Sequence, residues 1–279
     1  MKKNKKKFSA MEGIALLFGA AAIGVALYNI LPTYLDNQGS ARTYEKLERD
    51  YLDVAEPETE ADTREKKKDW WFTDVSIAFD ALQEENEEII AWLRFDASED
   101  LDISYPILYS GDNEKYLRSD IYGEEHTAGS LFLEGLNKPD FSDYYAVIYG
   151  HNMRDGSMFG DLDLYKETEV WEENQYFTLY TEEKAFRYQI FSSQTASSSS
   201  NVFRIGYIPG MEYQNFIDEM VEDSQIDTGI HPEKTDHILT LSTCTGNGYS
   251  SRTVVHAVRI DEQTTDQSRL LPEESEETQ

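Results

Sequence analysis

The sequence contains little cysteine and is short of positive charge. Cys244 is the single cysteine among 279 residues, so no disulfide can form within the chain, and the small disulfide-rich secreted folds are excluded. Acidic residues outnumber basic ones by 54 to 25, and the formal net charge is −29. A chain this acidic lacks the broad basic surface that binds a phosphate backbone, so we expect no nucleic-acid partner.

Long apolar runs are also scarce, and only one stands out, near the N-terminus. Residues 14–31 carry no charged side chain, and at about 1.5 Å per residue they just cross roughly 30 Å of hydrocarbon. The segment before this run is rich in lysine. The two features together predict a cytoplasmic basic N-terminus (1–13), a single transmembrane anchor (14–35) in the cell membrane and an extracytoplasmic remainder. A cleaved signal peptide is the alternative, but the length of the apolar run favours the uncleaved anchor.

After the anchor, the sequence predicts a helical and flexible tether over residues 36–71. Aromatic and leucine side chains recur at helical spacing over residues 44–51, which predicts a short amphipathic helix. Residues 53–69 contain almost no apolar side chain, so burial cannot offset the entropy lost on ordering them. A second helix is predicted from about Val75 to Leu93, because apolar side chains form one stripe there.

From Ile103 onward the pattern changes to short runs that are rich in β-branched and aromatic residues. The seven runs are ISYPILYS, GSLFLEG, YYAVIYG, FTLYT, AFRYQIFSS, HILTLSTC and RTVVHAVRI. Runs of this kind, separated by Gly, Asn and Asp, predict a closed or nearly closed β-barrel. One helix interrupts them, because apolar residues between Tyr213 and Val221 follow helical spacing. The acidic residues 261–279 predict a disordered tail.

Cys244 stands at the end of the run HILTLSTC, directly before the turn-rich residues TGNG. At the rim of a barrel its sulfur would be exposed, and a thiolate there can attack a carbonyl carbon. A lone cysteine is otherwise most often a small buried apolar residue, but the position between a strand and a glycine-rich turn favours a nucleophile. A papain-like protease is disfavoured, because its cysteine begins a helix.

Two further candidates, Arg252 and His151, also stand at strand ends. Arg252 begins the run after Cys244, and the short connection brings the two strand ends together. Its guanidinium can donate hydrogen bonds to an oxyanion, although an arginine at the rim can equally pair with a carboxylate. His151 follows the run YYAVIYG, and an imidazole can transfer protons near neutral pH.

The remaining histidines predict no metal site. His126 and His231 fall in loops, whereas His237 and His256 fall at the start of a strand or within one, where a structural role is favoured. Histidines this scattered, together with a single cysteine, match no zinc-binding pattern. We therefore expect neither a metal nor another cofactor.

At these residues the chain resembles the class B sortases, which are membrane-anchored cysteine transpeptidases of Gram-positive bacteria. The resemblance covers about Phe72 to Ile260 and is most specific in VIYGHNMRDGSMFGDL around His151 and in LTLSTC followed by RTVVHA. It implies that residues 72–260 form a catalytic domain, mainly β with flanking helices. That domain would be a closed eight-stranded sortase barrel with N-terminal helices and a long helix, near Met211 to Asp223, between strands 6 and 7.

The resemblance also implies the reaction and the residues that carry it. The catalytic set would be His151, Cys244 and Arg252. The peptide groove would be formed by Asn113, Leu117, Ser242, Thr243, Val202 and Phe203. The enzyme would cleave a C-terminal sorting signal of surface proteins after Thr, form a thioester, and transfer the protein to an amine of a peptidoglycan precursor (lipid II). Two alternatives stay open: a pilus-polymerising enzyme with a pilin lysine as acceptor, and an inactive module that binds sorting peptides.

Overall fold

The computed structural model describes residues 42–54, 75–96, 98, 101–244 and 250–265, with isolated positions at 19, 23–25 and 28; for Cys244 it describes the backbone alone. Almost all of the predicted anchor, most of the predicted flexible segment and residues 266–279 of the predicted tail therefore lie outside the described residues. Within the described ranges, no helix combines the length and the apolar character that crossing a membrane requires.

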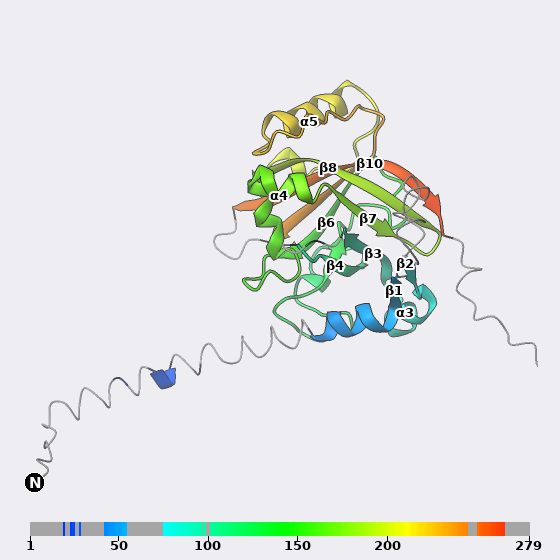
Figure 1. Ribbon diagram of the computed structural model, residues 1–279, viewed down its shortest axis with the longest axis vertical. Coiled ribbons are helices and arrows are strands. Elements are labelled where there is room, and N and C mark those ends of the chain that lie inside the picture. Colours follow the sequence, from blue (N-terminus) through cyan, green and yellow to red (C-terminus); the bar gives the residue numbers. More distant parts are fainter. Residues whose placement is uncertain are drawn as a thin grey trace, which may run out of the picture.

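Eight strands close into a barrel (Figure 1) in the order β10, β8, β7, β3, β4, β5, β6 and β9. Their bounds are β3 (Ile89–Phe95), β4 (Ser104–Leu108), β5 (Leu131–Leu133), β6 (Tyr145–His151), β7 (Tyr176–Tyr180), β8 (Lys184–Ser197), β9 (Ile238–Cys244) and β10 (Ser251–Thr264). Neighbouring strands run antiparallel except for β4 with β5 and β6 with β9, which run parallel. The predicted closed, mainly β barrel is confirmed, and each of the seven runs contributes one of its strands.

The eighth strand, β3, lies where the sequence analysis placed the end of a helix. The predicted helix from Val75 to Leu93 is wrong at both ends. β2 (Val75–Ile77) pairs antiparallel with β1 (Leu52–Val54), and only α3 (Phe79–Glu85) is helical. Most residues of β3 are buried on both faces, so apolar and polar side chains do not alternate along it. A short strand of that kind has no period that distinguishes it from a helix.

Asn86 ends α3 and begins the turn into β3. Its backbone is extended, with φ −155° and ψ 114°. Its Oδ1 accepts a hydrogen bond from the backbone N–H of Glu88 (2.9 Å), and its Nδ2 donates to the carbonyl of Ile121 (2.7 Å) and the hydroxyl of Tyr116 (2.9 Å). An asparagine side chain that binds nearby backbone groups in this way favours a turn over a continued helix.

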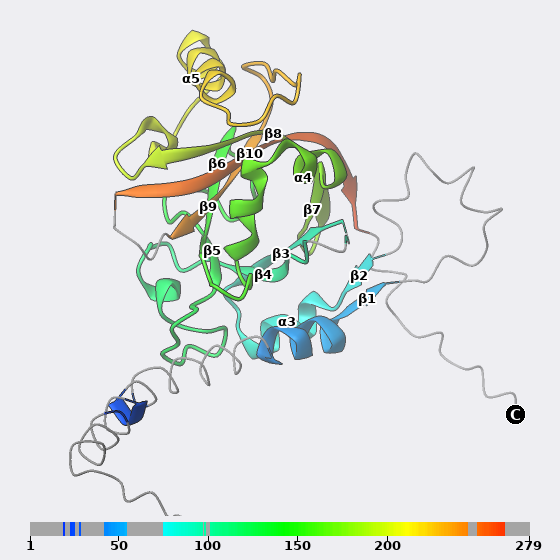
Figure 2. The same cartoon turned by 60° about the vertical axis from the view of Figure 1, so that its left-hand side comes forward.

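A helix over residues 42–51 packs on the barrel together with α3. Tyr44 and Leu47 are buried in the same hydrophobic core as the barrel strands, and the Tyr44 hydroxyl donates to the carbonyl of Gly129 (3.1 Å). The predicted helix over residues 44–51 is confirmed. Figure 2 shows this layer on one side of the barrel and α5 (Met211–Glu222) on the opposite side.

α5 connects β8 with β9, which are the sixth and seventh barrel strands in chain order, as the resemblance implies. Its apolar stripe is buried and consists of Tyr213, Phe216, Ile217 and Met220. At the other end of the chain, the predicted disordered tail begins too early. Residues 261–264 extend β10 and pair with residues 184–187 of β8, and Lys184 forms an ion pair with Glu262 there (3.0 Å).

Candidate active site

Three strand ends meet at one end of the barrel. β6 and β9 lie side by side and parallel, with His151 opposite Cys244 as the last pair of their register. β10 runs antiparallel to β9 and begins at that same end, with Val254 opposite Ser242. The structure therefore brings together the backbones of the three candidates His151, Cys244 and Arg252.

Short helical segments connect the strands of the barrel. They are the 3₁₀ helices η2 (Lys115–Leu117), η3 (Gly160–Lys166) and η4 (Asn201–Phe203) and the helix α4 (Thr168–Glu173). η2 precedes β5, η3 and α4 follow β6, and η4 follows β8. Loops that a rigid barrel positions in this way are common locations for binding and catalytic residues.

The Arg252 side chain is held beside the residue that precedes Cys244. Its Nη1 donates to the carbonyl oxygen of Thr243 at 3.2 Å, and its Cζ lies 5.9 Å from the centre of the Phe203 ring. Within the described part of the chain Arg252 forms no ion pair, so the alternative of a rim arginine paired with a carboxylate finds no support. A guanidinium has five N–H donors, and within the described residues Arg252 uses one of its two Nη atoms, in the bond to Thr243.

The half-buried His151 ring is held by a backbone carbonyl. Its Nε2 lies 2.7 Å from the carbonyl oxygen of Leu117 in η2. A carbonyl oxygen only accepts hydrogen bonds, so Nε2 carries the proton of the neutral ring and Nδ1 is the basic nitrogen. Burial lowers the pKa of His151 below its usual value, and the charges of Arg118 and Arg252 lower it further, while the bond to Leu117 opposes the shift. A neutral imidazole, able to accept a proton, is therefore favoured.

Asp163, in η3, links the chain neighbours of all three candidates. One carboxylate oxygen, Oδ2, accepts from Nδ2 of Asn152 at 2.8 Å. The other, Oδ1, accepts from the hydroxyl of Thr253, and the backbone N–H of Thr253 donates to Oγ1 of Thr243 at 3.1 Å. Asn152 follows His151, Thr253 follows Arg252, and Thr243 precedes Cys244.

The Asp163 carboxylate is kept ionised by its donors. Burial raises the pKa of this carboxyl, but hydrogen bonds from Lys166, Thr253 and Asn152 lower it by more, so that the net shift is downward. Asp163 was not among the residues predicted from the sequence. The residue lies within the motif GDLDLY, but nothing in its spacing from the strands indicates that η3 folds back onto β10.

Two predicted groove residues, Thr243 and Phe203, contact Arg252, and two more, Ser242 and Val202, are their chain neighbours. Ser242 and Thr243 are fully buried in β9, and among the described residues the Ser242 hydroxyl has no hydrogen-bond partner. Phe203, half-buried in η4, lies between the guanidinium of Arg252 and the ring of Tyr149, whose centre is 6.3 Å away. Val202 is buried before it.

Asn113 and Leu117, the other two predicted groove residues, have hydrogen bonds within the fold. Nδ2 of Asn113 donates to both carboxylate oxygens of the buried Glu134 at 2.8 Å, and its Oδ1 accepts from the N–H of Gly135 at 2.8 Å. The Tyr149 hydroxyl donates to the same carboxylate at 2.8 Å. The Asn113 amide thus connects its loop to β6, and the Leu117 carbonyl holds His151.

The buried His256 belongs to a directed chain of hydrogen bonds. Nε2 of Gln194 donates to its Nε2 (3.0 Å), its Nδ1 donates to Oγ1 of Thr240 (2.7 Å), Thr240 donates to the Tyr145 hydroxyl (3.0 Å), and Tyr145 donates to the Val202 carbonyl (2.7 Å). Burial lowers the pKa of His256 to about 3, so the ring is neutral. This histidine has the structural role that its place within a strand predicts, and the chain holds η4 against the barrel.

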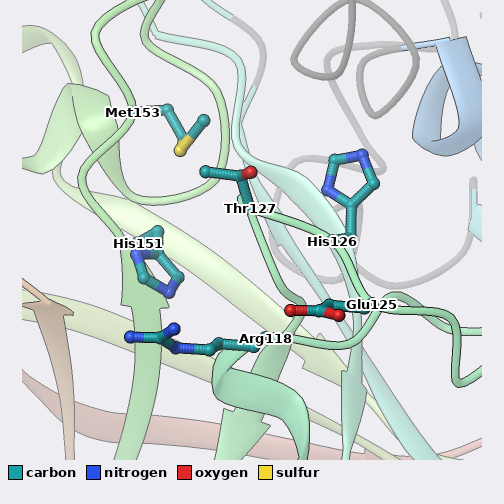
Figure 3. Close-up of a pocket in the computed structure, with 6 residues that line it drawn as sticks. All are labelled: Arg118, Glu125, His126, Thr127, His151 and Met153. Carbon is teal, nitrogen blue, oxygen red and sulfur yellow. The ribbon is translucent and has the colours of Figure 1, made fainter. Parts of the chain in front are cut away.

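A cavity of about 530 Å³ lies beside His151 (Figure 3). The residues that line it are Arg118, Glu125, His126, Thr127, His151 and Met153. Figure 3 shows the Arg118 guanidinium beside the His151 ring, with the Glu125 carboxylate pointing toward them. Over the ranges described, no cluster of three or more histidine, cysteine or acidic side chains could hold a metal ion.

Comparisons with known proteins agree with this geometry. A family model described as the sortase domain matches residues 99–260. The chain is 26% identical to sortase B of Staphylococcus aureus over 89% of this chain and 93% of the relative. It is 30% identical to sortase B of Listeria monocytogenes over 58% of this chain and 65% of the relative. Its fold is similar to that of sortase B from Bacillus anthracis, with a TM-score of 0.65 and 26% identity over 82% of this chain and 99% of that one.

Proposed function

Since the chain belongs to the sortase family and is a class B sortase, hence a cysteine transpeptidase, we propose that it attaches surface proteins to the cell wall. The observation that carries the proposal is the meeting of the ends of β6, β9 and β10. It supports a single site that combines a thiol, an imidazole and a guanidinium. The proposed catalytic residues are Cys244, His151 and Arg252.

In the proposed first half-reaction, Cys244 attacks the carbonyl carbon of a threonine in a C-terminal sorting signal. The thiol proton passes to the basic nitrogen of His151, and His151 then donates it to the amine that leaves when the C–N bond breaks. A thioester between Cys244 and the cleaved protein remains. The lowered pKa of His151 supports this role, because a neutral ring can take the thiol proton at the start.

Arg252 is proposed to stabilise the tetrahedral oxyanion. Its contacts with the carbonyl of Thr243 and the ring of Phe203 hold the guanidinium next to Cys244 before substrate arrives. Donors that are fixed in advance at the place where negative charge develops favour the transition state over the ground state. We also propose that the sorting peptide binds along Val202, Phe203, Leu117 and Asn113, above the fully buried Ser242 and Thr243.

In the proposed second half-reaction, an amine of a peptidoglycan precursor attacks the thioester. His151 accepts the proton of the amine, the new C–N bond forms, and Cys244 leaves as the thiolate. A pilin lysine would enter the reaction in the same way, so the acceptor decides between wall attachment and pilus assembly.

The predicted anchor at residues 14–35 supports a location at the outer face of the cell membrane. A sorting substrate that is held by its own apolar tail lies in the same plane, and confinement of both partners to that plane raises their effective concentration. Fractionation of cells followed by protease treatment of intact protoplasts tests this location. The catalytic domain should be degraded from outside, and full protection would contradict it.

Trapping of the acyl intermediate tests the proposed function. The full chain is incubated with a pool of candidate signal peptides, and mass spectrometry locates the adduct. We expect a thioester on Cys244 that carries the part of one peptide up to its threonine. Cys244→Ala should form no adduct and keep the melting temperature of the wild type. Cleavage of a sorting peptide by Cys244→Ala would contradict the assignment.

A further inference from the structure

The loop of residues 118–127 forms one wall of the cavity beside His151. The backbone N–H of His126 donates to the carbonyl of Arg118 at 2.8 Å, and Oδ1 of Asp120 accepts from the N–H groups of Tyr122 and Glu124 at 2.9 Å each. Ser119 and Glu125 are paired by a β-bridge. These contacts fix the backbone positions from which two opposite charges, Arg118 and Glu125, extend into the cavity.

Among the described residues, neither of these charged side chains has a partner that stabilises the fold. Arg118 and Glu125 are exposed, and within the described part of the chain neither forms a hydrogen bond or an ion pair through its side chain. The chain is strongly acidic, with a net charge of −29, so a guanidinium at the wall of this cavity supplies a local positive charge to which an anion can bind. The position of Arg118 beside the imidazole of His151 indicates that its guanidinium binds an anion.

We propose that this cavity binds the amine acceptor of the second half-reaction, and that it selects a primary amine with a carboxylate on the same carbon. Glu125 would bind the ammonium group and Arg118 the carboxylate, since a guanidinium and a carboxylate form paired hydrogen bonds. This inference rests on the proposed function, because it assigns the acceptor for that same thioester.

The position of His151 fits the transfer. His151 lines the cavity, and its strand neighbour in β9 is Cys244, so an amine that enters from the cavity meets the base before it reaches the thioester. The base removes one proton from the ammonium group and passes it to solvent water, so that the ring is neutral again. The nitrogen then attacks the thioester carbonyl, gives a second proton to the base as the C–N bond forms, and the C–S bond breaks to release the Cys244 thiolate.

A site of this kind distinguishes a wall amine from a pilin lysine. The side chains of lysine and of meso-diaminopimelate end in the same primary amine, but only diaminopimelate carries a carboxylate on the carbon that bears it. The pair Arg118 and Glu125 therefore favours a diamino acid of the wall over a pilin lysine. The cavity has room for such an end group, because about 530 Å³ exceeds the volume of one amino acid.

The test uses two synthetic tripeptide acceptors that are identical except for diaminopimelate or lysine at one position. The full chain is acylated with the sorting peptide found by the trapping experiment, and each rate of amide formation is divided by the rate of thioester hydrolysis in the same sample. We expect the wild type to use the diaminopimelate peptide about tenfold faster than the lysine peptide, the size of one charge-assisted hydrogen bond.

Two variants test how Arg118 and Glu125 contribute to the use of the diaminopimelate peptide. Arg118→Gln should use both peptides at similar rates, because the carboxylate loses its partner. Glu125→Gln should slow both peptides by about threefold to tenfold, because the ammonium group loses its partner. The matched controls are Glu124→Gln, an exposed neighbour of Glu125, and Lys234→Gln, an exposed cation outside the cavity. Both controls should keep the ratio of the wild type.

Other outcomes overturn the proposal. Equal use of the two peptides by the wild type, a preference for lysine, or an unchanged preference in Arg118→Gln would each do so. If the wild type forms the thioester but transfers it to neither amine, the acceptor assignment fails and the first half-reaction stands. If no signal peptide acylates Cys244, the proposed function fails first, and the inference fails with it.

Discussion

At the scale of single residues, the site depends on groups that do not react. His151 is oriented by a backbone carbonyl, that of Leu117, whereas the carboxylate of Asp163 binds the residues beside the proposed catalytic ones. A displacement of about 1 Å can reduce a rate by roughly a hundredfold. Asp163 is therefore a positioning residue, because it acts through Asn152 and Thr253 and does not itself contact the reacting atoms.

Asp163→Asn should lower kcat by about tenfold and change KM for the sorting peptide by less than about twofold. The amide offers one acceptor oxygen in place of two, so the link to Asn152 or the link to Thr253 is lost while the peptide groove remains. Steady-state kinetics of peptide cleavage measures both constants. Asp161→Asn is the matched control, since it lies in η3 and makes neither link.

Two other results would contradict this role. One is an equal loss of kcat in Asp161→Asn, which would point to a general disturbance of η3. The other is a change confined to KM, which would place Asp163 in substrate binding. Asp163→Glu should restore part of kcat, because it keeps two acceptor oxygens on a longer side chain.

At the scale of elements, His256 connects strands with the segment that borders the site. Its ring joins β8 through Gln194 and β9 through Thr240, and the chain of hydrogen bonds continues through Tyr145 of β6 to Val202 of η4. The two end groups set the direction of every hydrogen bond in this series. The amide N–H of Gln194 can only donate, and the carbonyl of Val202 can only accept. Both nitrogens of a protonated His256 ring are donors, so the ring could no longer accept the hydrogen bond from Gln194.

The stability of the barrel should therefore fall in acid because of His256. Its pKa is about 3 in the folded chain and 6.5 in its unperturbed state. Above pH 6.5 the His256 ring is neutral in both the folded and the unfolded chain, so His256 makes its full contribution to the free energy of unfolding. Between 6.5 and about 3 the unfolded chain binds a proton that the folded chain does not, so stability is lost as the pH falls.

Thermal unfolding of the wild type and of His256→Gln measures this effect. We expect the melting temperature of the variant to fall less between about pH 7 and about pH 4 than that of the wild type, whatever its value at pH 7. His231→Gln is the control for the loss of an exposed histidine, and it should change the slope less than His256→Gln does. Equal slopes for all three proteins would contradict the assignment.

The elements also show what sequence patterns can and cannot predict. The short connection between two strands was enough to predict that Cys244 and Arg252 lie near each other, whereas the place of His151 beside them followed from the resemblance. The register of β6 with β9 brings the backbones of His151 and Cys244 together. β3 was not predictable from its period, since it is buried on both faces. The roles of Asp163 and of the Leu117 carbonyl depend on how η3 and η2 fold back onto β10 and β6, and no local pattern encodes such contacts.

At the scale of the whole molecule, the N-terminal layer is part of the folded unit. Tyr44, Leu47 and Leu52 are buried in the same core as the barrel strands, although the sequence analysis assigned them to a tether. Burial of one such side chain contributes about 1.5–3 kcal/mol. The stability of the catalytic domain therefore depends on a segment that precedes residue 72.

Two truncated chains test this dependence. A chain that begins at residue 72 should melt at least about 5 °C lower than one that begins at residue 42, because it loses the buried helix and the pairing of β1 with β2. Calorimetry measures both melting temperatures, and peptide hydrolysis shows whether the site survives. Identical melting temperatures would contradict the role of this layer.

The parallel pairing of β6 with β9 has a consequence for the timing of activity. β7, β8 and α5 all lie between these two strands in the chain, so β6 and β9 can pair only after the segment between them has closed into a loop. Contacts between residues so distant in sequence form late in folding. A newly made chain would thus carry an inert thiol, and it would become competent for acyl transfer only when the last strands are in place.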